Sequence, residues 1–544
     1  MSKRHNRNFF FLADLNEIRG DVNRAATESE RERAFRFSQI LPSKSEPVSD
    51  TLLESLAIAM TAGEKKDSKV PAGYTYLGQF IDHDLTLDKT DVTLGTVVDV
   101  AQLRQGRSPA LDLDCMYGLG PIAEPIFYQS DGIKLKLGKT KESPGNNISA
   151  LPLDDFDLPR RGNATADPEE SRTALIPDIR NDENLIVGQT HLAFIRFHNA
   201  VCDRLAGSAV PSALLFEKAR EQVVKHYQWL IRHDFLPRIV DPTILDDVFN
   251  NGRRVFEIGG LGTPTMPIEF SVAAYRLGHA MIRDKYDWNA IFGQNGVFGD
   301  IGILLNMFRF SGTSGNLSPG TDVNKPLDGT FERLPTNWVA DWTRLYDFAT
   351  DGTPELSPET TLNFAKAIET SLTNPLAELP IGSFAKRGNT IVRPIEMNLA
   401  FRNLVRGKMV GLASGQEMSN HIAELVSGSQ PPLTAEQILG NNLENLNSSE
   451  RTKLSENTPL WFYVLREAEL NQGKLGQVGG RIVAETFHRS IESSDISILR
   501  DPTFKPTFGP DDKTFRMSDL LKVAFKAAAG ELRPLSPGAP RPTA

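Results

Sequence analysis

Apolar residues return every three or four positions along much of the chain, which is the spacing of helices with one buried face. The firmest pattern covers residues 185–205, with Asn181 or Asp182 as the candidate cap at its start. Similar patterns predict helices over residues 211–232, 271–283, 396–410, 459–470, 479–491 and 517–529. Strand-like alternation is short, and residues 133–137 (IKLKL) are the best candidate. The pattern therefore predicts a mainly α protein with long loops and little β-structure.

Turn-forming residues mark the long loops, which we place at residues 157–170, 310–325 and 444–459. Neither a repeat nor a linker divides the middle of the chain. The first fifty residues are charged and weakly periodic, and the last fourteen are rich in proline. We expect an N-terminal arm over residues 1–50, one large domain over residues 51–530 and a disordered Pro-rich tail over residues 531–544.

Composition narrows the class of protein. The 544 residues are 40% hydrophobic and 24% charged, which is ordinary for a soluble globular protein. The net charge of −9 is spread without a long basic run, so the chain lacks the electrostatic footprint of a nucleic-acid-binding protein. Two cysteines exclude a disulfide framework. The apolar run at residues 9–13 is too short for a signal peptide or a membrane span, so we expect a cytoplasmic or leaderless secreted protein.

A first cluster of polar residues lies in the segment GYTYLGQFIDHDLTLD, residues 73–88. Gln79, Asp82, His83 and Asp84 fall within one and a half helical turns. On a helix, Gln79 and His83 are four residues apart and share a face. Taken alone, this segment also fits an ordinary surface turn.

A second cluster is the segment SPALDLDCMYG, residues 108–118. Ser108, Ala110, Asp112 and Asp114 alternate, so in an extended loop their oxygen atoms point the same way. An all-oxygen set suits calcium better than zinc or iron, although the spacing is not that of an EF-hand. Taken alone, this segment is better explained as an acidic surface loop.

Three further segments each carry two polar residues one helical turn apart. They are DIRNDEN with Arg180 and Glu183, YRLGHAM with Arg276 and His279, and AFRNLVRGKMVG with Asn403 and Arg406. A spacing of three or four residues places both side chains on one face of a helix. None of these pairs is decisive by itself.

The order of the five segments resembles the animal-type haem peroxidase family, also called the peroxidase-cyclooxygenase superfamily, in its bacterial branch. HNAVCDRL, YQWLIRHDFLP and LGQVGGRIVAE support the resemblance, which runs from residue 73 to residue 491. The resemblance implies a single large helical haem peroxidase domain that contains haem b and reduces hydrogen peroxide.

The resemblance also implies roles for the clustered residues. His83 is the expected distal histidine, which moves a proton between the peroxide oxygens. Arg180 is its expected catalytic partner, which stabilises developing charge, and Gln79 is the distal glutamine. His279 is the expected ligand of the haem iron, oriented by Asn403. Arg276 and Arg406 are expected to face the haem propionates.

Asp82 and Glu183 match the carboxylates that form ester bonds to haem methyl groups in mammalian members of the family. Asn184 stands where the chloride-oxidising mammalian enzyme has a methionine. We therefore expect bromide, iodide, thiocyanate or phenols, rather than chloride, as electron donors.

By the same resemblance, Asp84, Ser108, the Ala110 carbonyl, Asp112 and Asp114 form a structural calcium site, with Asp114 in place of the usual serine. A bound ion would fix the residue after His83 against the loop. Its removal would then disturb the distal side of the haem site.

Two alternatives stay open. The first is a fatty-acid dioxygenase of the same superfamily, whose radical-forming tyrosine lies three residues before the proximal histidine. Arg276 occupies that position here and Tyr275 is one residue off, which favours a peroxidase. The second is a non-catalytic peroxidase-like binding domain, against which the complete set of haem-contact residues argues.

Overall fold

The computed structural model describes residues 35–536, together with residues 11–12 and 18–19. It leaves out residues 64, 91, 143–150, 163–167, 209, 260–261, 294–301, 316–331, 359–361, 380–392 and 441–442. The expected N-terminal arm therefore lies partly outside the described residues, and so does most of the Pro-rich tail. The domain boundaries stay predictions.

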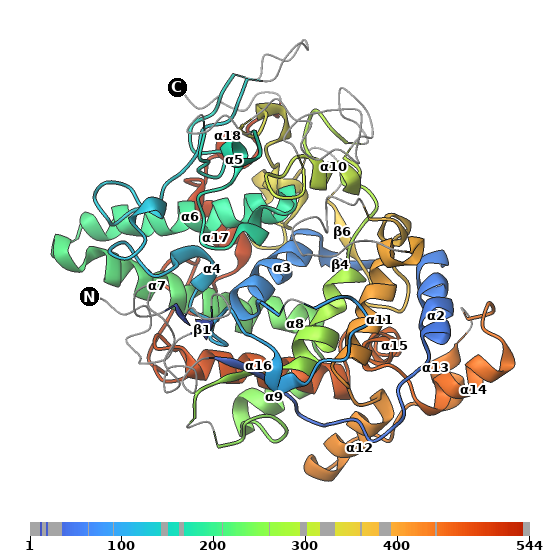
Figure 1. Ribbon diagram of the computed structural model, residues 1–544. Helices are drawn as coiled ribbons and strands as arrows, with labels where there is room; N and C mark the ends of the chain where they lie inside the picture. Colours follow the sequence, from blue (N-terminus) through green and yellow to red (C-terminus); the bar gives the residue numbers. More distant parts are fainter. Residues whose placement is uncertain are drawn as a thin grey trace.

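Helices are the main regular structure of the described residues, as the sequence pattern predicts (Figure 1). The α-helices are α2 (Asp50–Ala62), α3 (Gly73–Leu85), α4 (Asp114–Tyr117), α5 (Pro168–Arg172), α6 (Leu185–Ala206), α7 (Leu215–Leu230), α8 (Leu236–Ile239), α9 (Pro242–Asn251), α10 (Leu304–Arg309), α11 (Leu399–Met409), α12 (Gly415–Leu425), α13 (Ala435–Leu439), α14 (Ser448–Glu456), α15 (Leu460–Leu470), α16 (Gln477–Ser493), α17 (Met517–Ala524) and α18 (Ala529–Leu532).

The strands of the described residues form three small two-stranded sheets. β1 (Phe11–Leu12) pairs antiparallel with β2 (Ile18–Arg19), β3 (Arg36–Ser38) pairs parallel with β5 (Thr265–Pro267), and β4 (Asp67–Pro71) pairs antiparallel with β6 (Phe364–Lys366). The β3–β5 and β4–β6 pairs join segments distant in the chain, but the small sheets form no layer of their own. The fold is therefore held together by helix packing.

Helix α6 confirms the firmest prediction, with a corrected cap. Asn184, rather than Asn181 or Asp182, accepts a hydrogen bond from the backbone N–H of Val187 through its side chain. Helices α11, α15, α16 and α17 also lie at the predicted places. The helix predicted from residue 211 becomes regular only at Leu215, after a 3₁₀ turn.

The segment that carries His279 departs from the regular helix predicted over residues 271–283. It consists of a π-helical turn, Glu269–Ala273, followed by a 3₁₀ helix, Ala274–His279. The break falls at Ala273, whose φ of −125° and ψ of −77° lie outside the helical region. Apolar residues three apart fit either helix type, so the sequence pattern did not distinguish them.

Two other predictions were wrong. Residues 133–137 form no strand: Leu135 makes only an isolated antiparallel bridge with Tyr128, and the side chain of Asn199 takes the N–H and the carbonyl of Leu135. The loop predicted at residues 444–459 contains α14, whose first turn is stabilised by a capping box of Asn447 and Glu450. The pattern missed α14 because Leu454 is its one buried residue. The loops predicted at 157–170 and 310–325 lie partly outside the described residues.

Helix α3 lies at the centre of the view in Figure 1, with α6 and α7 on one side and α11 and α2 on the other. It contacts α6, and the Phe80 ring stacks on the Phe194 ring with centroids 4.5 Å apart. The Tyr227 ring of α7 meets both phenylalanines edge to face. Such aromatic pairs contribute about 0.5–1.5 kcal/mol each beyond area burial, so this cluster fixes α3 in the core.

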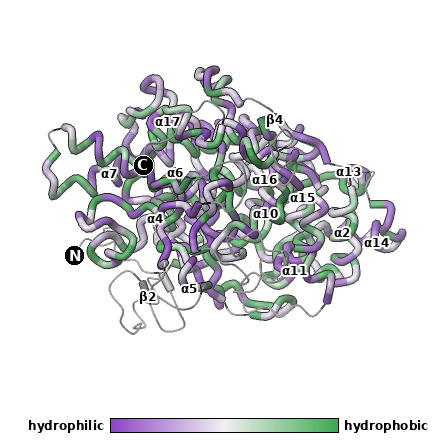
Figure 2. The backbone as a smooth tube through the Cα atoms, turned by 90° about the horizontal axis from the view of Figure 1, so that it is seen from above, coloured by the Kyte–Doolittle hydropathy of each residue, from purple (hydrophilic) through white to green (hydrophobic). Residues whose placement is uncertain are grey.

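Hydrophobic and hydrophilic residues alternate at short intervals along most of the tube in Figure 2. The buried hydrophobic residues form one continuous core that reaches from Phe37 to Leu532. No helix among the described residues is both long and apolar enough to cross a membrane.

Glu269 fastens the segment after β3 to the π-helical turn that leads to His279. Its side chain is buried, and Oε1 accepts hydrogen bonds from the backbone N–H groups of Ile40 and Leu41 at 2.9 and 3.1 Å. Oε2 is buried and has no hydrogen-bond partner among the described residues. Burial raises the pKa of this carboxyl group to about 7.

Because its pKa in the folded state is raised, Glu269 contributes stability below pH 4.5, and that contribution is lost as the pH rises through 7. We expect Glu269→Gln to remove this pH-dependent contribution to the free energy of unfolding. The stability of the variant relative to wild type should rise by about 1–3 kcal/mol between about pH 5 and about pH 8. Thermal unfolding at both pH values measures it. Parallel pH profiles for the two proteins would contradict the assignment.

Candidate active site

A cavity of about 830 Å³ opens at the centre of the fold. It is bounded by α3, the 3₁₀ turn Ile179–Asp182, the 3₁₀ helix Ala274–His279 and α11. The predicted site residues that line it are Gln79, Asp82, His83, Arg180, Glu183, Arg276, His279, Asn403 and Arg406. Four segments spread over more than three hundred residues thus supply one site.

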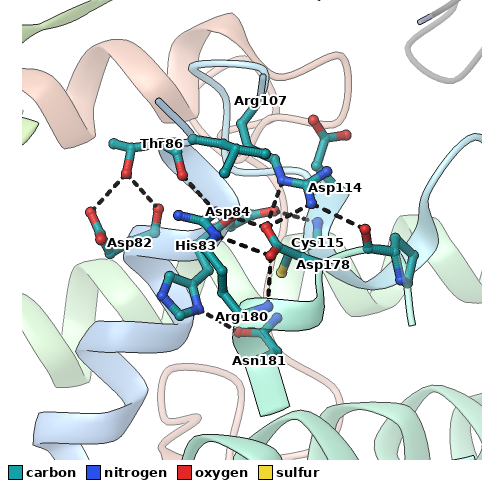
Figure 3. Close-up of polar contacts among 12 residues, drawn as sticks. Asp82, His83, Asp84, Thr86, Arg107, Asp114, Cys115, Asp178, Arg180 and Asn181 are labelled. Atoms are coloured by element: carbon teal, nitrogen blue, oxygen red, sulfur yellow. Dashed lines mark hydrogen bonds and ion pairs between the residues drawn. The ribbon is translucent and has the colours of Figure 1, made fainter. Parts of the chain in front are cut away.

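His83 lies on α3 with its ring almost completely buried. Its Nδ1 is 2.8 Å from Asn181 Oδ1 (Figure 3). Its Nε2 is 3.6 Å from Glu183 Oε1. Burial and the neighbouring Arg180 guanidinium together lower the pKa of His83, outweighing the nearby carboxylates. The ring is therefore neutral at physiological pH and carries a single N–H.

Arg180 is held by Asp178 and by the end of α3. Its Nη2 donates to the backbone oxygens of His83 and Thr86 at 3.1 and 2.7 Å, while Nε and Nη2 donate to the Asp178 carboxylate (Figure 3). Arg107 reaches the same carboxylate, with Nη2 at 2.6 Å from Oδ2. Burial alone would raise the pKa of Asp178, but the two guanidinium groups hold it well below its usual range. These contacts fix the Arg180 guanidinium against the end of α3 that carries His83.

Gln79, Glu183 and Asn184 form a hydrogen-bonded row beside His83. Gln79 Nε2 donates to Glu183 Oε1 at 2.8 Å, and Asn184 Nδ2 donates to Gln79 Oε1 at 2.9 Å. Asp82 accepts instead from the Thr86 hydroxyl at 3.0 Å. Asn184 therefore both caps α6 and orients the Gln79 amide.

His279 ends its 3₁₀ helix across the cavity from α3. Its Nδ1 lies 2.7 Å from Asn403 Nδ2. Burial, with a smaller effect from Arg276, lowers the pKa of His279 to about 3. The imidazole is neutral, as a metal ligand must be. If Nε2 binds a metal, Nδ1 carries the proton and must donate a hydrogen bond. Rotation of the Asn403 amide by half a turn would present its oxygen to Nδ1 as the acceptor.

Three arginines lie on the same side of the cavity as His279. Arg276 Nε donates to the Ser271 carbonyl at 2.8 Å, and the Arg406 guanidinium lies 3.8 Å from Asp88 and is partly exposed. Arg402 also lines the cavity, with its side chain nearly buried and Nη1 donating to the Glu396 carbonyl. The sequence analysis singled out Arg276 and Arg406 but missed Arg402.

The predicted calcium ligands are all buried, and none of them lines the cavity. Asp84 accepts from the backbone N–H groups of Leu113 and Cys115, and Asp114 accepts from that of Ser108. Burial, with repulsion from Asp112 and Asp114, raises the pKa of Asp84 well above its usual range. No three His, Cys, Asp or Glu side chains among the described residues are arranged as a ready metal site.

The cavity suits a flat apolar cofactor that binds through a metal and carries acidic groups. Most of its remaining lining is aliphatic or aromatic, including Leu103, Ile268 and Phe308. A neutral imidazole on each side offers a ligand for a metal and a base facing it, and the arginines can pair with carboxylates. This combination of donors fits haem.

Sequence reasoning missed several residues that support the site. Asn181 and Asp178 stood in the DIRNDEN segment but were considered there as caps or not at all, and Arg107 precedes the acidic loop. Their roles depend on contacts across 71 to 98 residues of sequence. In the sequence, the only indication of these supporting residues was their position close to Arg180 and Ser108.

Comparison with known proteins gives matches in sequence and in fold. Residues 96–297 match the family model described as "Animal haem peroxidase". That segment contains Arg180, Glu183, the acidic loop and His279, whereas His83 precedes it and Asn403 follows it. A "Peroxidase-like protein" from Margaritifera margaritifera is 31% identical over 124 residues, which is 22% of this chain and 16% of that protein.

Solved structures resemble the whole chain in fold at low sequence identity. Peroxidase A from Dictyostelium discoideum superposes with a TM-score of 0.55 at 14% identity, covering 100% of both chains. The fatty acid alpha-dioxygenase of Oryza sativa gives 0.52 at 15% identity, covering 93% of this chain and 84% of the other. That of Arabidopsis thaliana gives 0.53 at 14% identity, covering 93% and 82%.

The sequence match and the shared fold lead to one conclusion: residues 96–297 resemble an animal haem peroxidase domain, and the chain has the fold of peroxidase A and of the fatty acid alpha-dioxygenases.

Proposed function

We propose that the protein is a haem peroxidase that reduces hydrogen peroxide and oxidises small organic donors or the halides and pseudohalides bromide, iodide and thiocyanate. The observation that carries this proposal is the single cavity that places neutral His83 beside Arg180, with neutral His279 lining the same cavity. His279 would hold haem in this cavity through its iron, and the haem would supply the redox chemistry for cleavage of the O–O bond.

The residues of this chain would do the acid–base and electrostatic work. His83 Nε2 accepts a proton from hydrogen peroxide and returns it to the departing oxygen, which leaves as water. Arg180, held in place by Asp178, stabilises the negative charge that develops on oxygen. Arg276, Arg402 and Arg406, which line the cavity, would pair with the acidic groups of haem b.

A fatty-acid dioxygenase is the second candidate, because two of the solved structures with this fold are fatty acid alpha-dioxygenases. Tyr275 lines the cavity, and its hydroxyl donates to the Gly78 carbonyl at 3.2 Å. It lies one residue from the position of the radical tyrosine, which Arg276 occupies. That displacement favours the peroxidase.

Replacing His83 by Gln should lower the rate of reaction with hydrogen peroxide by about a hundredfold or more, because the base is lost. Stopped-flow absorption of the haem-loaded protein measures this rate. His421→Gln, on the outer helix α12, is the matched control and should react as wild type does.

Three results would decide against the peroxidase. Uptake of oxygen with a fatty acid, without peroxide-dependent oxidation of bromide or a phenol, would establish the dioxygenase. Folded protein that fails to take up haem would favour a non-catalytic binding domain. An unchanged rate in His83→Gln would remove His83 from the reaction.

Asp82 and Glu183 line the cavity and are proposed to form ester bonds to haem methyl groups. Each ester needs the loss of two electrons from carboxylate and methyl group, for which one hydrogen peroxide is the oxidant and becomes two waters. We expect haem to resist acidic solvent extraction after turnover with peroxide but not before. Asp82→Asn and Glu183→Gln should each lose one link, read by mass spectrometry of haem peptides. Free extraction after turnover would refute the ester bonds.

A calcium ion bound by Asp84, Ser108, the Ala110 carbonyl, Asp112 and Asp114 would relieve the repulsion among the three buried carboxylates. Chelation should then lower the melting temperature, since an ion at a hundred times its Kd contributes about 2.7 kcal/mol. Asp112→Asn should weaken the response, whereas Asp203→Asn, an exposed carboxylate on α6, should not. A melting temperature indifferent to calcium would rule out the site.

A further inference from the structure

The contact between His83 and Asn181 assigns a role to a residue outside the expected set. Asn181 belongs to the 3₁₀ turn Ile179–Asp182, and its side chain is fully buried. Its Oδ1 lies 2.8 Å from His83 Nδ1, at normal hydrogen-bond length. Asn181 directly follows Arg180, so one short turn delivers both partners of His83.

Only one end of the His83 ring can use this contact. Asn181 Oδ1 is an acceptor, so it requires the proton on Nδ1 and leaves the lone pair on Nε2. Nε2 is the nitrogen nearer to Glu183, but at 3.6 Å the pair is longer than a hydrogen bond. Glu183 Oε1 already accepts from Gln79 at 2.8 Å. Nε2 is therefore left as a hydrogen-bond acceptor on the cavity side of the ring.

The other end of the Asn181 amide makes no competing contact. Its Nδ2 is buried and has no hydrogen-bond partner among the described residues. The contact of the amide with the imidazole is therefore made through Oδ1.

We propose that Asn181 is the positioning residue that fixes the tautomer of His83, holding the proton on Nδ1 so that Nε2 faces the cavity as the base. This inference rests on the proposed function for its consequence, but the tautomer itself can be measured without haem. A ring with its proton on Nε2 could not take a proton from peroxide.

The test uses the full-length protein labelled with ¹⁵N-histidine. Long-range ¹H–¹⁵N correlation spectra of the haem-free protein show which ring nitrogen carries the proton, and the signal that disappears in His83→Gln identifies His83. Wild type should show the proton on Nδ1. A proton on Nε2 in wild type would overturn the proposal before any variant at Asn181 is made.

Two variants at position 181 separate hydrogen bonding from packing. Asn181→Leu keeps the size but removes the acceptor, so the proton should move to Nε2, toward Glu183. Asn181→Asp retains the acceptor and should restore the proton to Nδ1. Asn199→Leu removes a buried asparagine that serves only the backbone of Leu135 and should leave the His83 signals unchanged.

The haem-loaded proteins give the second readout. Asn181→Leu should react with hydrogen peroxide about ten- to a hundredfold more slowly than wild type, and Asn181→Asp should recover most of the rate. If the tautomers follow this pattern but wild type fails to react with peroxide, the proposed function is wrong while the positioning role stands. Asn181→Leu with the proton still fixed on Nδ1 would show that Asn181 only packs.

Discussion

The buried carboxylate of Asp178 is the constraint around which the distal side of the site is built. It receives Arg107 from the segment before the acidic loop and Arg180 from the turn before α6. A buried carboxylate without partners would cost several kcal/mol, so the two guanidinium groups and Asp178 stabilise one another only in this arrangement. Arg180 then reaches back to the carbonyls of His83 and Thr86, which joins the network to the end of α3. Removing Asp178 would leave both buried guanidinium groups without their shared counter-charge.

The 3₁₀ turn Ile179–Asp182 converts this network into positions for reacting groups. Asp178 caps the turn through the backbone N–H of Arg180, and the turn places Asn181 against His83. Asp182, at its end, pairs with Arg160 and accepts from the backbone of Gly312. The consecutive side chains of Arg180, Asn181 and Asp182 therefore have different partners. A 3₁₀ turn permits this because successive residues are rotated by about 120°. This turn thus brings Arg180 and Asn181 to His83, which lies on α3.

The opposite side of the cavity is organised differently. His279 lies at the end of a 3₁₀ helix that follows a π-helical turn, and the two are separated by the non-helical backbone of Ala273. The π turn is fastened at its first residue by Glu269, and the 3₁₀ helix is fastened by packing of Tyr275 on Phe270, with centroids 4.6 Å apart. Mixed helix types of this kind often occur at functional sites, because a change in hydrogen-bond spacing redirects side chains. Here the change directs His279 and Arg276 toward one cavity.

The sequence by itself determined the helical class, the places of α6, α11, α15, α16 and α17, and the segments that carry the site. The periodicity of apolar residues and the spacing of polar pairs are local properties of the sequence, so they can be read without knowing how distant segments pack. Assignment to the bacterial branch and the ester, halide and calcium expectations stay predictions. The tertiary structure decided that His83 meets Asn181, that Asp178 holds two arginines, that Arg402 joins the cavity and that residues 269–279 change helix type. These features depend on side chains about seventy or more residues apart, or on backbone hydrogen bonds that several helix types satisfy equally, and local periodicity carries no information about either.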